Sequence, residues 1–304
     1  MLSILIPVYQ YDAFPLAAEL QKQCASLYIP FEIICQDDAS TTFIAENQVI
    51  NTLENGTFSS NVFNLGRGRN CNALAEKATY DWLLILDCDT FPKDADFIKN
   101  YLEFIQNQSG TVAFGGIVYQ PERPSEEKVL RWVYGTARES LSVKKRNANP
   151  NGNALTSNLL IKKNVFVSNP FKESITQYGY EDLVFLSDLK KKGVVVKHID
   201  NATYHLGLES SKQFLEKTKT AIENLAFLHD SKSIETTDSK LISAYSVLKK
   251  MQLVRIFAWF FEKYEAKITS NLVSGQPSLL VFDGYKLGYF CKIKATPYFD
   301  KLRK

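Results

Sequence analysis

The sequence has no long apolar run, no closely paired cysteines and no low-complexity linker. Its longest uninterrupted apolar runs, Trp82–Leu86 and Ile256–Phe261, are far too short to span a bilayer. No basic leader or small-residue cleavage site precedes the first apolar segment, so we expect no signal peptide. The five cysteines are odd in number and widely spaced without a C-x-x-C pair, which predicts reduced thiols in a cytoplasmic protein.

The composition predicts a globular chain with a substantial core. Hydrophobic residues make up 45% and charged residues 23% of the 304 positions. The 20 Phe and 15 Tyr are spread along the whole length, so disorder is not indicated. The net charge is only +3, but Lys249 to Lys304 holds 11 Lys and Arg against 4 Asp and Glu. This basic tail favours an anionic surface as a partner.

Strand and helix signals alternate along the N-terminal third of the chain. Three apolar runs are predicted to be buried strands: Leu2–Val8, Phe31–Cys35 and Trp82–Leu86. Helix-prone segments and a short strand around Asn61–Phe63 separate them, which predicts βαβ units and a parallel sheet. Such sheets bind ligands at the carboxyl ends of their strands. Four carboxylates fall at these ends: Asp37, Asp38, Asp87 and Asp89.

The pattern changes after Pro92. Val112–Tyr119 is predicted as one strand, and Tyr180–Lys192 as a helix. From Ser211 the chain is predicted to be helical to about Ile268, with an irregular basic tail behind it. The simplest division is a catalytic domain over residues 1–210 and a helical, basic C-terminal extension over residues 211–304.

Two carboxylates directly after the strand Trp82–Leu86 are the sharpest chemical signal. The strand should hold Asp87 and Asp89 rigidly at the sheet edge, and hard oxygen ligands in that setting suit Mg²⁺ or Mn²⁺ bridging to phosphates. Carboxylates at strand ends also cap helices or order turns, so the pair alone decides little.

Five short motifs occur in order along the chain: Ile6-Pro7-Val8-Tyr9, Asp37-Asp38-Ala39-Ser40, Asn64-Leu65-Gly66-Arg67, Asp87-Cys88-Asp89 and Tyr180-Glu181-Asp182. Over about residues 2–210 the ordered set resembles a family 2 glycosyltransferase of the GT-A fold. The following helices resemble, more weakly, extensions of some bacterial members. The resemblance implies an α/β fold with a Rossmann-like mixed sheet and flanking helices. About residues 1–110 would bind the nucleotide sugar, and about residues 111–210 would form the acceptor side.

The resemblance also implies roles on the nucleotide side. Pro7 and Tyr9 would line the nucleotide pocket, and Asp38 would accept a hydrogen bond from the base, most simply the N3–H of a uracil. Gly66 would let the backbone approach the nucleotide, while Arg67 contacts the nucleotide or orders the loop. Taken alone, this loop would be a turn with a solvated arginine.

One departure from the family pattern concerns the same loop. Many members carry Arg-Asn where this chain has Cys71-Asn72. Whether Arg69 supplies the missing positive charge is open from the sequence.

The resemblance implies a metal site and a catalytic base. Asp89 would ligate Mn²⁺ or Mg²⁺, Asp87 would contact the ribose or assist the metal, and His205 would be a further metal ligand. Asp182 would take the proton of the acceptor hydroxyl, with inversion at the anomeric carbon, and Glu181 would hold an acceptor hydroxyl. Taken alone, the two acids would be the first turn of a helix, and the histidine a hydrogen-bonded structural residue.

The predicted function is metal-dependent transfer of a sugar from a nucleotide-diphosphate sugar, with a UDP-sugar favoured. The acceptor would be a glycan or lipid-linked saccharide, as in polysaccharide biosynthesis, and no nucleic-acid partner is expected. One alternative is a catalytically inactive nucleotide- or sugar-binding module. A haloacid-dehalogenase-type phosphatase would need Thr or Val where Phe91 stands, and a sugar-phosphate nucleotidyltransferase would need a Gly-rich loop after the first strand.

The C-terminal extension has an amphipathic signal of its own. Val247–Ile268 is predicted as one helix with an apolar stripe: Leu248, Met251, Val254, Ala258 and Phe261, widened by Trp259 and Phe260. Lysines and an arginine are interspersed with these residues. Two interpretations are open: a helix packed on the catalytic domain, or an interfacial helix that attaches the protein peripherally to anionic lipid on the inner face of the membrane.

Overall fold

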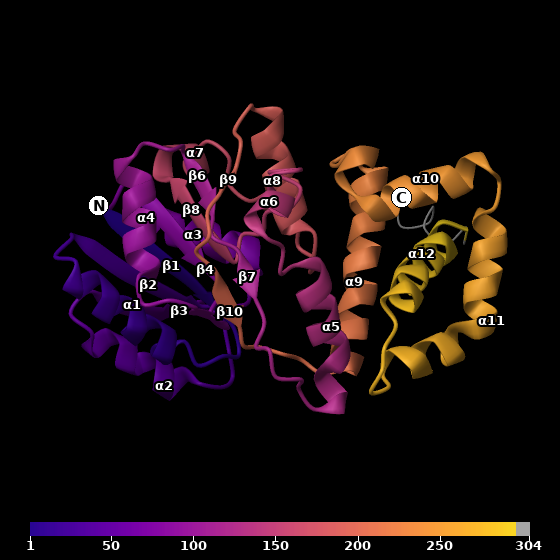
Figure 1. The fold of residues 1–304 in the computed structure, drawn as a ribbon, viewed down its shortest axis with the longest axis horizontal. Coiled ribbons are helices and arrows are strands. Elements are labelled where there is room, and N and C mark those ends of the chain that lie inside the picture. The colour runs from indigo at the N-terminus through magenta and orange to yellow at the C-terminus, as the bar shows by residue number, and fades with distance from the viewer. Residues whose placement is uncertain (296–304) are drawn as a thin grey trace. The chain divides into compact units, whose positions relative to one another are not determined.

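The computed structural model describes residues 1–295, which form two compact units (Figure 1). The first unit comprises Met1–Gln120, Arg138–Thr176 and Glu181–Gly207. Pro121–Ala137 and Gln177–Tyr180 join the chain from Leu208 onward in the second unit. The chain therefore enters the second unit three times, whereas the sequence suggests one boundary near residue 210.

The first unit is built on a seven-stranded mixed sheet of order β3-β2-β1-β4-β8-β6-β9. Its strands are β1 (Leu2–Val8), β2 (Phe31–Asp37), β3 (Gly56–Ser60), β4 (Trp82–Leu86), β6 (Val112–Phe114), β8 (Asn158–Lys162) and β9 (Lys197–His198). The first four are parallel, as the alternating pattern predicts. β8 runs antiparallel to both β4 and β6, which makes the sheet mixed and the fold class α/β as predicted. The strand expected around Asn61–Phe63 is wrong, because β3 ends at Ser60.

A second, three-stranded sheet forms where one long strand was predicted. Its order is β5 (Thr90–Pro92), β10 (Thr203–His205), β7 (Ile117–Val118). The segment Val112–Tyr119 is divided between the two sheets at Gly115 and Gly116. Gly116 has φ +104°, a backbone conformation that non-glycine residues rarely adopt, so β6 ends there and β7 begins in the other sheet.

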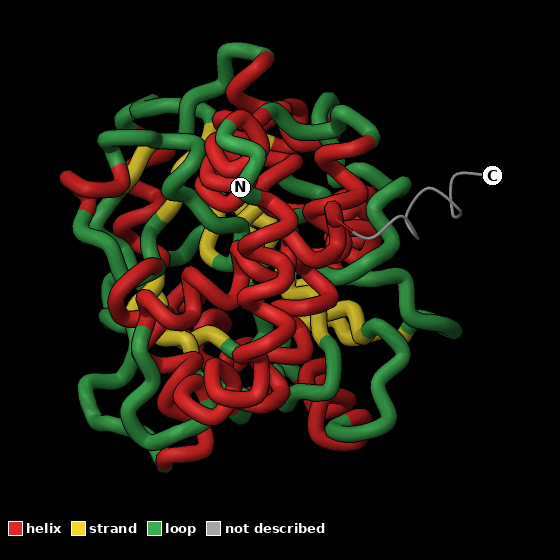
Figure 2. The backbone as a smooth tube through the Cα atoms, turned by 90° about the vertical axis from the view of Figure 1, so that its right-hand side faces the viewer, coloured by secondary structure: helices red, strands yellow, loops and turns green. Residues whose placement is uncertain are grey.

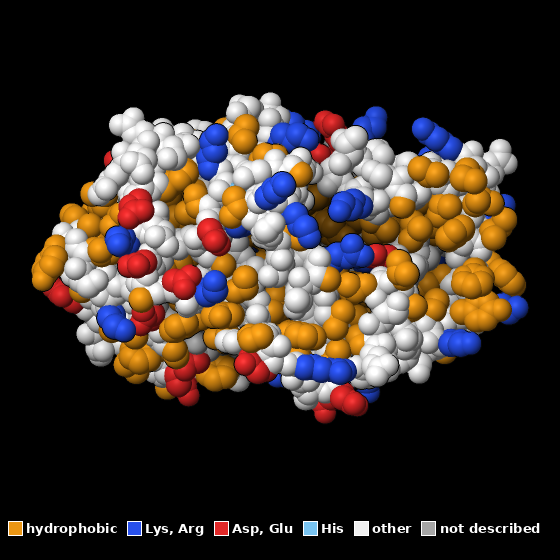
Figure 3. Space-filling view, in the orientation of Figure 1, with side chains coloured by type: hydrophobic (Ala, Val, Ile, Leu, Met, Phe, Trp, Pro, Cys, Tyr) orange, Lys and Arg blue, Asp and Glu red, His pale blue; other side chains and the backbone are white. Residues whose placement is uncertain are grey.

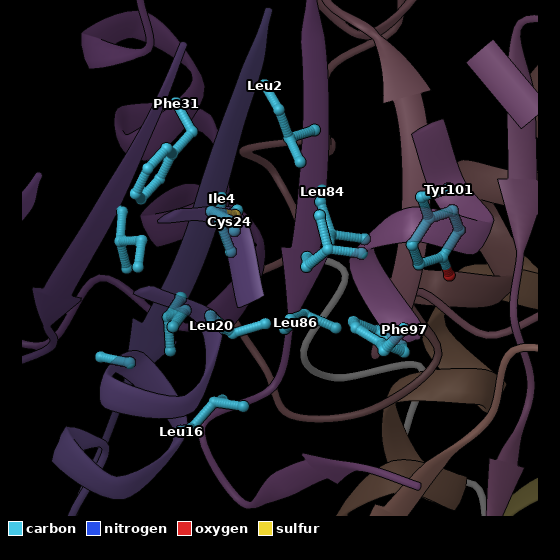
Figure 4. Packing of buried hydrophobic residues seen from close by; sticks show 14 of the residues in the cluster. Leu2, Ile4, Leu16, Leu20, Cys24, Phe31, Leu84, Leu86, Phe97 and Tyr101 are labelled. Atoms are coloured by element: carbon cyan, nitrogen blue, oxygen red, sulfur yellow. The ribbon is translucent and has the colours of Figure 1, made fainter. Parts of the chain in front are cut away.

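Helices cover both faces of the large sheet. They are α1 (Phe14–Ser26), α2 (Ile44–Gln48), α3 (Arg67–Lys77), α4 (Phe97–Gln106), α6 (Val143–Arg146), α7 (Lys163–Val167) and α8 (Glu181–Lys191), with the short 3₁₀ turn η1 (Val49–Thr52). Side chains alternate across β1, so Ile4 and Ile6 join one apolar cluster and Leu5 the other. Figure 4 shows the first cluster, where Leu84 and Leu86 of β4 lie between residues of α1 and α4.

The second unit is helical in its described part (Figures 1 and 2). Its helices are α5 (Val129–Arg138), α9 (Ser211–Asp230), α10 (Lys240–Lys250), α11 (Val254–Leu272) and α12 (Leu279–Ala295), with the 3₁₀ turns η2 (Glu126–Lys128) and η3 (Thr236–Asp238). Leu130 of α5, Leu215 of α9, Phe261 of α11 and Phe282 of α12 share one buried cluster. None of the helices within residues 1–295 combines the length and apolarity needed to cross a membrane.

The single helix predicted over Val247–Ile268 is wrong, since the chain breaks between α10 and α11. Gln252 adopts φ +60°, and its N–H donates to the Lys249 carbonyl while the Leu253 N–H donates to the Leu248 carbonyl. This is the hydrogen-bond pattern of a Schellman C-cap. Glycine or asparagine usually marks this left-handed position, and the glutamine here hides it from sequence analysis.

The tail behind Ile268 was predicted to be irregular, and this prediction is wrong for residues 279–295. Residues 279–295 form α12, which packs along α11 and contributes Phe282, Tyr285 and Phe290 to the buried core. Apolar residues occur on every side of this helix, so the sequence shows no single apolar face of helical period that would predict it. The rest of the predicted basic tail, residues 296–304, lies outside the described residues.

Candidate active site

The acidic motifs meet at one edge of the large sheet. Asp37 is the last residue of β2, Asp38 follows it, and Asp87 follows β4. β1 lies between these two strands and is parallel to both, so the carboxylates fall at carboxyl ends, as predicted. Pro7 is buried within β1, and Tyr9 just beyond this strand has 53% of its surface exposed.

The Asp38 carboxylate orders the loop before α3. It accepts hydrogen bonds from the backbone N–H groups of Leu65 and Gly66, each at 2.8 Å, and from Asn61 Nδ2 at 2.9 Å. A carboxylate has about four acceptor positions, so one more donor could still be accommodated. Gly66 has φ +83°, with open space where a side chain would begin; the backbone conformation, rather than crowding, requires glycine here.

Arg67 opens α3 and joins two acidic motifs that are far apart in the sequence. Its Nε and Nη2 donate to Asp87 Oδ1 at 2.8 and 2.6 Å, and its Nη1 donates to Asp182 Oδ1 at 3.0 Å. Although burial lowers the pKa of Arg67, Asp87 and Asp182 raise it well above its ordinary value. Burial raises the pKa of Asp87, and the guanidinium acts against that rise. One guanidinium therefore holds both carboxylates.

Arg69 does not reach the acidic cluster. Its Nε and Nη2 donate to the Glu173 carbonyl, on an exposed part of the loop. Cys71, where many family members carry arginine, is fully buried. Arg67 lies one helical turn before Cys71 and so on the same face of α3. Within the described residues, the positive charge at this cluster comes from Arg67.

Glu181 and Asp182 open α8, as predicted. Asp182 accepts hydrogen bonds from the Thr156 hydroxyl and backbone N–H in addition to that from Arg67. Glu181 differs, because its Oε2 is buried with no hydrogen-bond partner among residues 1–295. Burial and the Asp182 carboxylate raise the pKa of Glu181, while Arg67 lowers it. The two adjacent acids therefore have different surroundings.

Strand pairing brings His205 to Asp89. β5 starts directly after Asp89, and β10 pairs antiparallel with it so that His205 lies opposite Thr90. His205 Nε2 is 3.4 Å from Asp89 Oδ2, and the Leu206 N–H donates to the Asp89 carbonyl at 2.8 Å. Gly207 leaves room for this carboxylate, since a Cβ there would lie 2.3 Å from Asp89 Oδ2.

The donor set at Asp89 fits a metal that shares its coordination with a substrate. Residues 1–295 contain no cluster of three or more His, Cys, Asp and Glu side chains arranged to hold a metal. They do contain the Asp89–His205 pair, one carboxylate oxygen and one imidazole nitrogen at 3.4 Å. Mg²⁺ is commonly bound through one or two carboxylates with substrate phosphates and waters completing the shell, and such a site needs no closed protein cage.

Two residues of this region were missed by sequence analysis. Thr156 contacts Asp182 and Arg67, and the Tyr119 ring stacks on His205 with ring centroids 5.4 Å apart. Tyr119 also donates a hydrogen bond from its hydroxyl to Glu139. Neither residue belongs to a sequence motif. Their contacts with Asp182, Arg67 and His205 form only in the folded chain, so no local signal in the sequence indicates them.

The fold and this site together define a class, the nucleotide-sugar transferases of GT-A type. The parallel half of the sheet carries acidic residues at the carboxyl ends of its strands. Glu181 and Asp182 open α8, and Arg67 connects Asp182 to Asp87 at this edge. The sequence model described as "Glycosyl transferase family 2" matches residues 3–166, more than half of the chain, so the chain belongs to that family and is a glycosyltransferase. None of the curated proteins matches it.

Three solved structures are similar in fold. The mannosyltransferase PcManGT from Pyrobaculum calidifontis, solved with GDP-Man and Mn²⁺, has a TM-score of 0.56 at 12% identity over 97% of this chain and 85% of that chain. Glucosyl-3-phosphoglycerate synthase from Mycobacterium tuberculosis was solved with Mn²⁺, UDP and glucosyl-3-phosphoglycerate. It has a TM-score of 0.50 at 14% identity over 74% of this chain and 78% of that chain. S. aureus TarS has a TM-score of 0.47 at 19% identity over 80% of this chain and 42% of that chain. This chain therefore spans less than half of that TarS chain.

Proposed function

We propose that this protein transfers a sugar from a nucleotide-diphosphate sugar to a saccharide acceptor in a metal-dependent, inverting reaction. The observation that carries the proposal is the Arg67 guanidinium, which ties Asp87 on the donor side to Asp182 on the acceptor side. The Arg67 side chain therefore connects Asp182 to Asp87, which directly follows β4 and lies two residues before Asp89. This arrangement suits a reaction between two substrates that meet at one carbon atom.

The nucleotide would bind at the carboxyl ends of β1 and β2. Tyr9 and Pro7 would flank the base, the remaining acceptor position of Asp38 would take its N–H, and the Gly66 backbone would approach the nucleotide. A UDP-sugar is the favoured donor. The solved relatives support a nucleotide donor in general, since one holds UDP and another GDP-Man.

Asp89 and His205 would hold a divalent cation, Mn²⁺ or Mg²⁺, with Asp87 assisting. When bound, the cation would stabilise negative charge on the leaving diphosphate. Two of the similar structures contain Mn²⁺, which supports the choice of a divalent metal. Asp182 would accept the proton of the attacking hydroxyl, and the unpartnered Glu181 Oε2 would accept a hydrogen bond from another acceptor hydroxyl.

The acceptor would be a glycan or a lipid-linked saccharide, as in polysaccharide biosynthesis. Residues 1–210 would form the catalytic domain, with about 1–110 on the donor side and 111–210 on the acceptor side. The helical extension from 211 would provide peripheral attachment to an anionic membrane on its inner face.

A panel of nucleotide sugars tests the donor proposal. We expect one UDP-sugar to raise the melting temperature in the presence of Mn²⁺ or Mg²⁺, and to be hydrolysed slowly when no acceptor is present. Excess EDTA should remove both effects. Stabilisation without any hydrolysis or transfer would favour the alternative of an inactive binding module.

Replacing Arg67 tests whether its two ion pairs matter for the reaction. We expect Arg67→Ala to lower kcat by about 10²-fold, because misplacing a catalytic group by an ångström has effects of that size. Arg67→Lys should recover only part of the loss, since an ammonium group cannot reproduce the planar fork between two carboxylates. Arg69→Ala on the same helix is the matched control and should keep its activity. Equal losses in the Arg67→Ala and Arg69→Ala variants would contradict the assignment.

Replacing His205 tests its role as a metal ligand. We expect His205→Ala to raise the metal concentration needed for half-maximal activity by about 10-fold or more, since even groups that only support metal ligands have effects of this size. The control is His229→Ala, whose histidine lies in the second unit. An unchanged metal titration would make His205 a structural residue that packs on Tyr119.

A further inference from the structure

The exposed side of α11 carries several large apolar side chains. Ala258, Phe261 and Leu272 are buried, which leaves the opposite side of α11 open. On that side Ile256 and Trp259 each have 57% of their surface exposed, and Phe260 has 53%. In Figure 3, apolar side chains gather at the right-hand edge, where Figure 1 draws α11, with lysine or arginine side chains at their border.

Helical geometry puts apolar and basic residues in one row. Ile256, Phe260, Lys263 and Lys267 follow each other at intervals of three or four residues, with Trp259 alongside. The Lys263 ammonium lies 4.9 Å from the centroid of the Trp259 ring and 5.5 Å from that of Tyr264. We call these five residues, Ile256, Trp259, Phe260, Lys263 and Lys267, the outer face of α11.

Acidic side chains are turned away from this face. The helix contains only two, Glu262 and Glu265, and each lies 3.7 Å from Lys292 of α12. Within α11, Lys263 and Lys267 therefore lie on the outer face, whereas Glu262 and Glu265 lie on the side that faces α12, together with Arg255 one row along from Glu262. Trp259 and Phe260 were predicted to widen the apolar stripe that contains Ala258 and Phe261, but they lie on the opposite, exposed side of the helix.

We propose that the outer face of α11 is a docking surface for an anionic lipid bilayer. Rings of Trp and Phe insert into the interface between headgroups and acyl chains, while lysines contact anionic headgroups. The charge distribution favours lipid over a second copy of this chain, because two like-charged outer faces would repel each other. The inference deepens the proposed function, since it gives a lipid-linked acceptor a surface to lie in, but it needs no transfer activity to be tested.

Flotation of the full-length protein with vesicles tests the proposal. We expect binding at low salt to vesicles of phosphatidylglycerol and phosphatidylcholine, and little binding to phosphatidylcholine alone. Lys263→Gln/Lys267→Gln should weaken the partition by about 30-fold, which corresponds to losing two charges near an anionic surface. Trp259→Ser/Phe260→Ser, which removes both exposed rings, should abolish flotation. All replaced side chains are at the surface, and an unchanged melting temperature verifies folding.

Matched controls separate the outer face from general effects of charge and apolarity. Lys190→Gln/Lys191→Gln removes two charges from α8, and Phe227→Ser removes an exposed ring from α9; both should float as the original chain does. Absence of flotation with anionic vesicles, or equal losses in controls and outer-face variants, would overturn the proposal. So would a dimer that Trp259→Ser/Phe260→Ser converts to a monomer. Donor hydrolysis measured on the same samples tests the proposed function separately.

Discussion

Asp182→Asn is expected to lower kcat by about 10²–10⁴-fold, the usual contribution of a general base. An acceptor hydroxyl is a poor nucleophile near neutral pH, so a carboxylate must receive its proton as the new bond forms. Asparagine keeps the shape and a hydrogen-bonding oxygen next to Arg67 and Thr156, but has no basic oxygen. Donor affinity should change little, because the nucleotide would bind at the ends of β1 and β2.

Two neighbouring variants sharpen this test. Asp188→Asn makes the same change on the same helix, where Asp188 pairs with Lys172 at 2.9 Å, and should retain activity. Glu181→Gln should raise the KM for the acceptor more than it lowers kcat, because Glu181 would hold a hydroxyl that does not react. The product anomer, read by NMR, gives an independent check. Retained configuration, or near-normal kcat in Asp182→Asn, would show that Asp182 is not the base.

Asp89→Asn is expected to abolish transfer and to weaken metal-dependent nucleotide binding. An amide oxygen is a poor substitute for an anionic ligand of a hard divalent cation. Calorimetric titration of nucleotide with and without Mn²⁺ should show that the metal no longer strengthens binding. Excess EDTA should have the same effect on the unaltered enzyme.

The control for this variant is Asp96→Asn, which changes an exposed carboxylate at the start of α4. Its metal dependence should match that of the original chain. If the Asp89→Asn enzyme were fully active, or if transfer continued in EDTA, the metal would have no place in the reaction. The loss in the His205→Ala variant should be smaller, because a carboxylate and the diphosphate would still hold the cation.

Local patterns predicted the part of the fold that depends on continuous apolar runs. β1, β2 and β4 are buried on both faces, so each is recognisable from its own residues, and the acids that follow them are at the predicted edge. β3 was misplaced because only Phe58 in it is buried. Val62 and Phe63, which suggested a strand, are instead exposed in a loop.

Long-range contacts could not be predicted in the same way. Arg67 and Asp182 are 115 residues apart, and nothing near Arg67 indicates which carboxylate it meets. The strand pattern alone placed Asp87 at the sheet edge, but Arg67 and Asp182 were suggested as site residues only through a family resemblance, and whether Arg69 adds a positive charge there was left open. His205 reaches Asp89 because β10 pairs with β5, and strands of three residues carry too little pattern to reveal a partner.

The threefold passage of the chain into the second unit limits how the protein could be shortened. Within that unit, Tyr134 of α5 lies against Phe214 and Phe282, and Asn224 of α9 donates hydrogen bonds to the Gln177 and Gly179 carbonyls. A gene cut after codon 207 would still encode α5 and the Gln177–Tyr180 segment, but not the helices that cover them. Such a product would carry bare apolar surface and would be prone to aggregate. Expression of a minimal catalytic fragment therefore requires redesign of two internal segments as well as a stop codon.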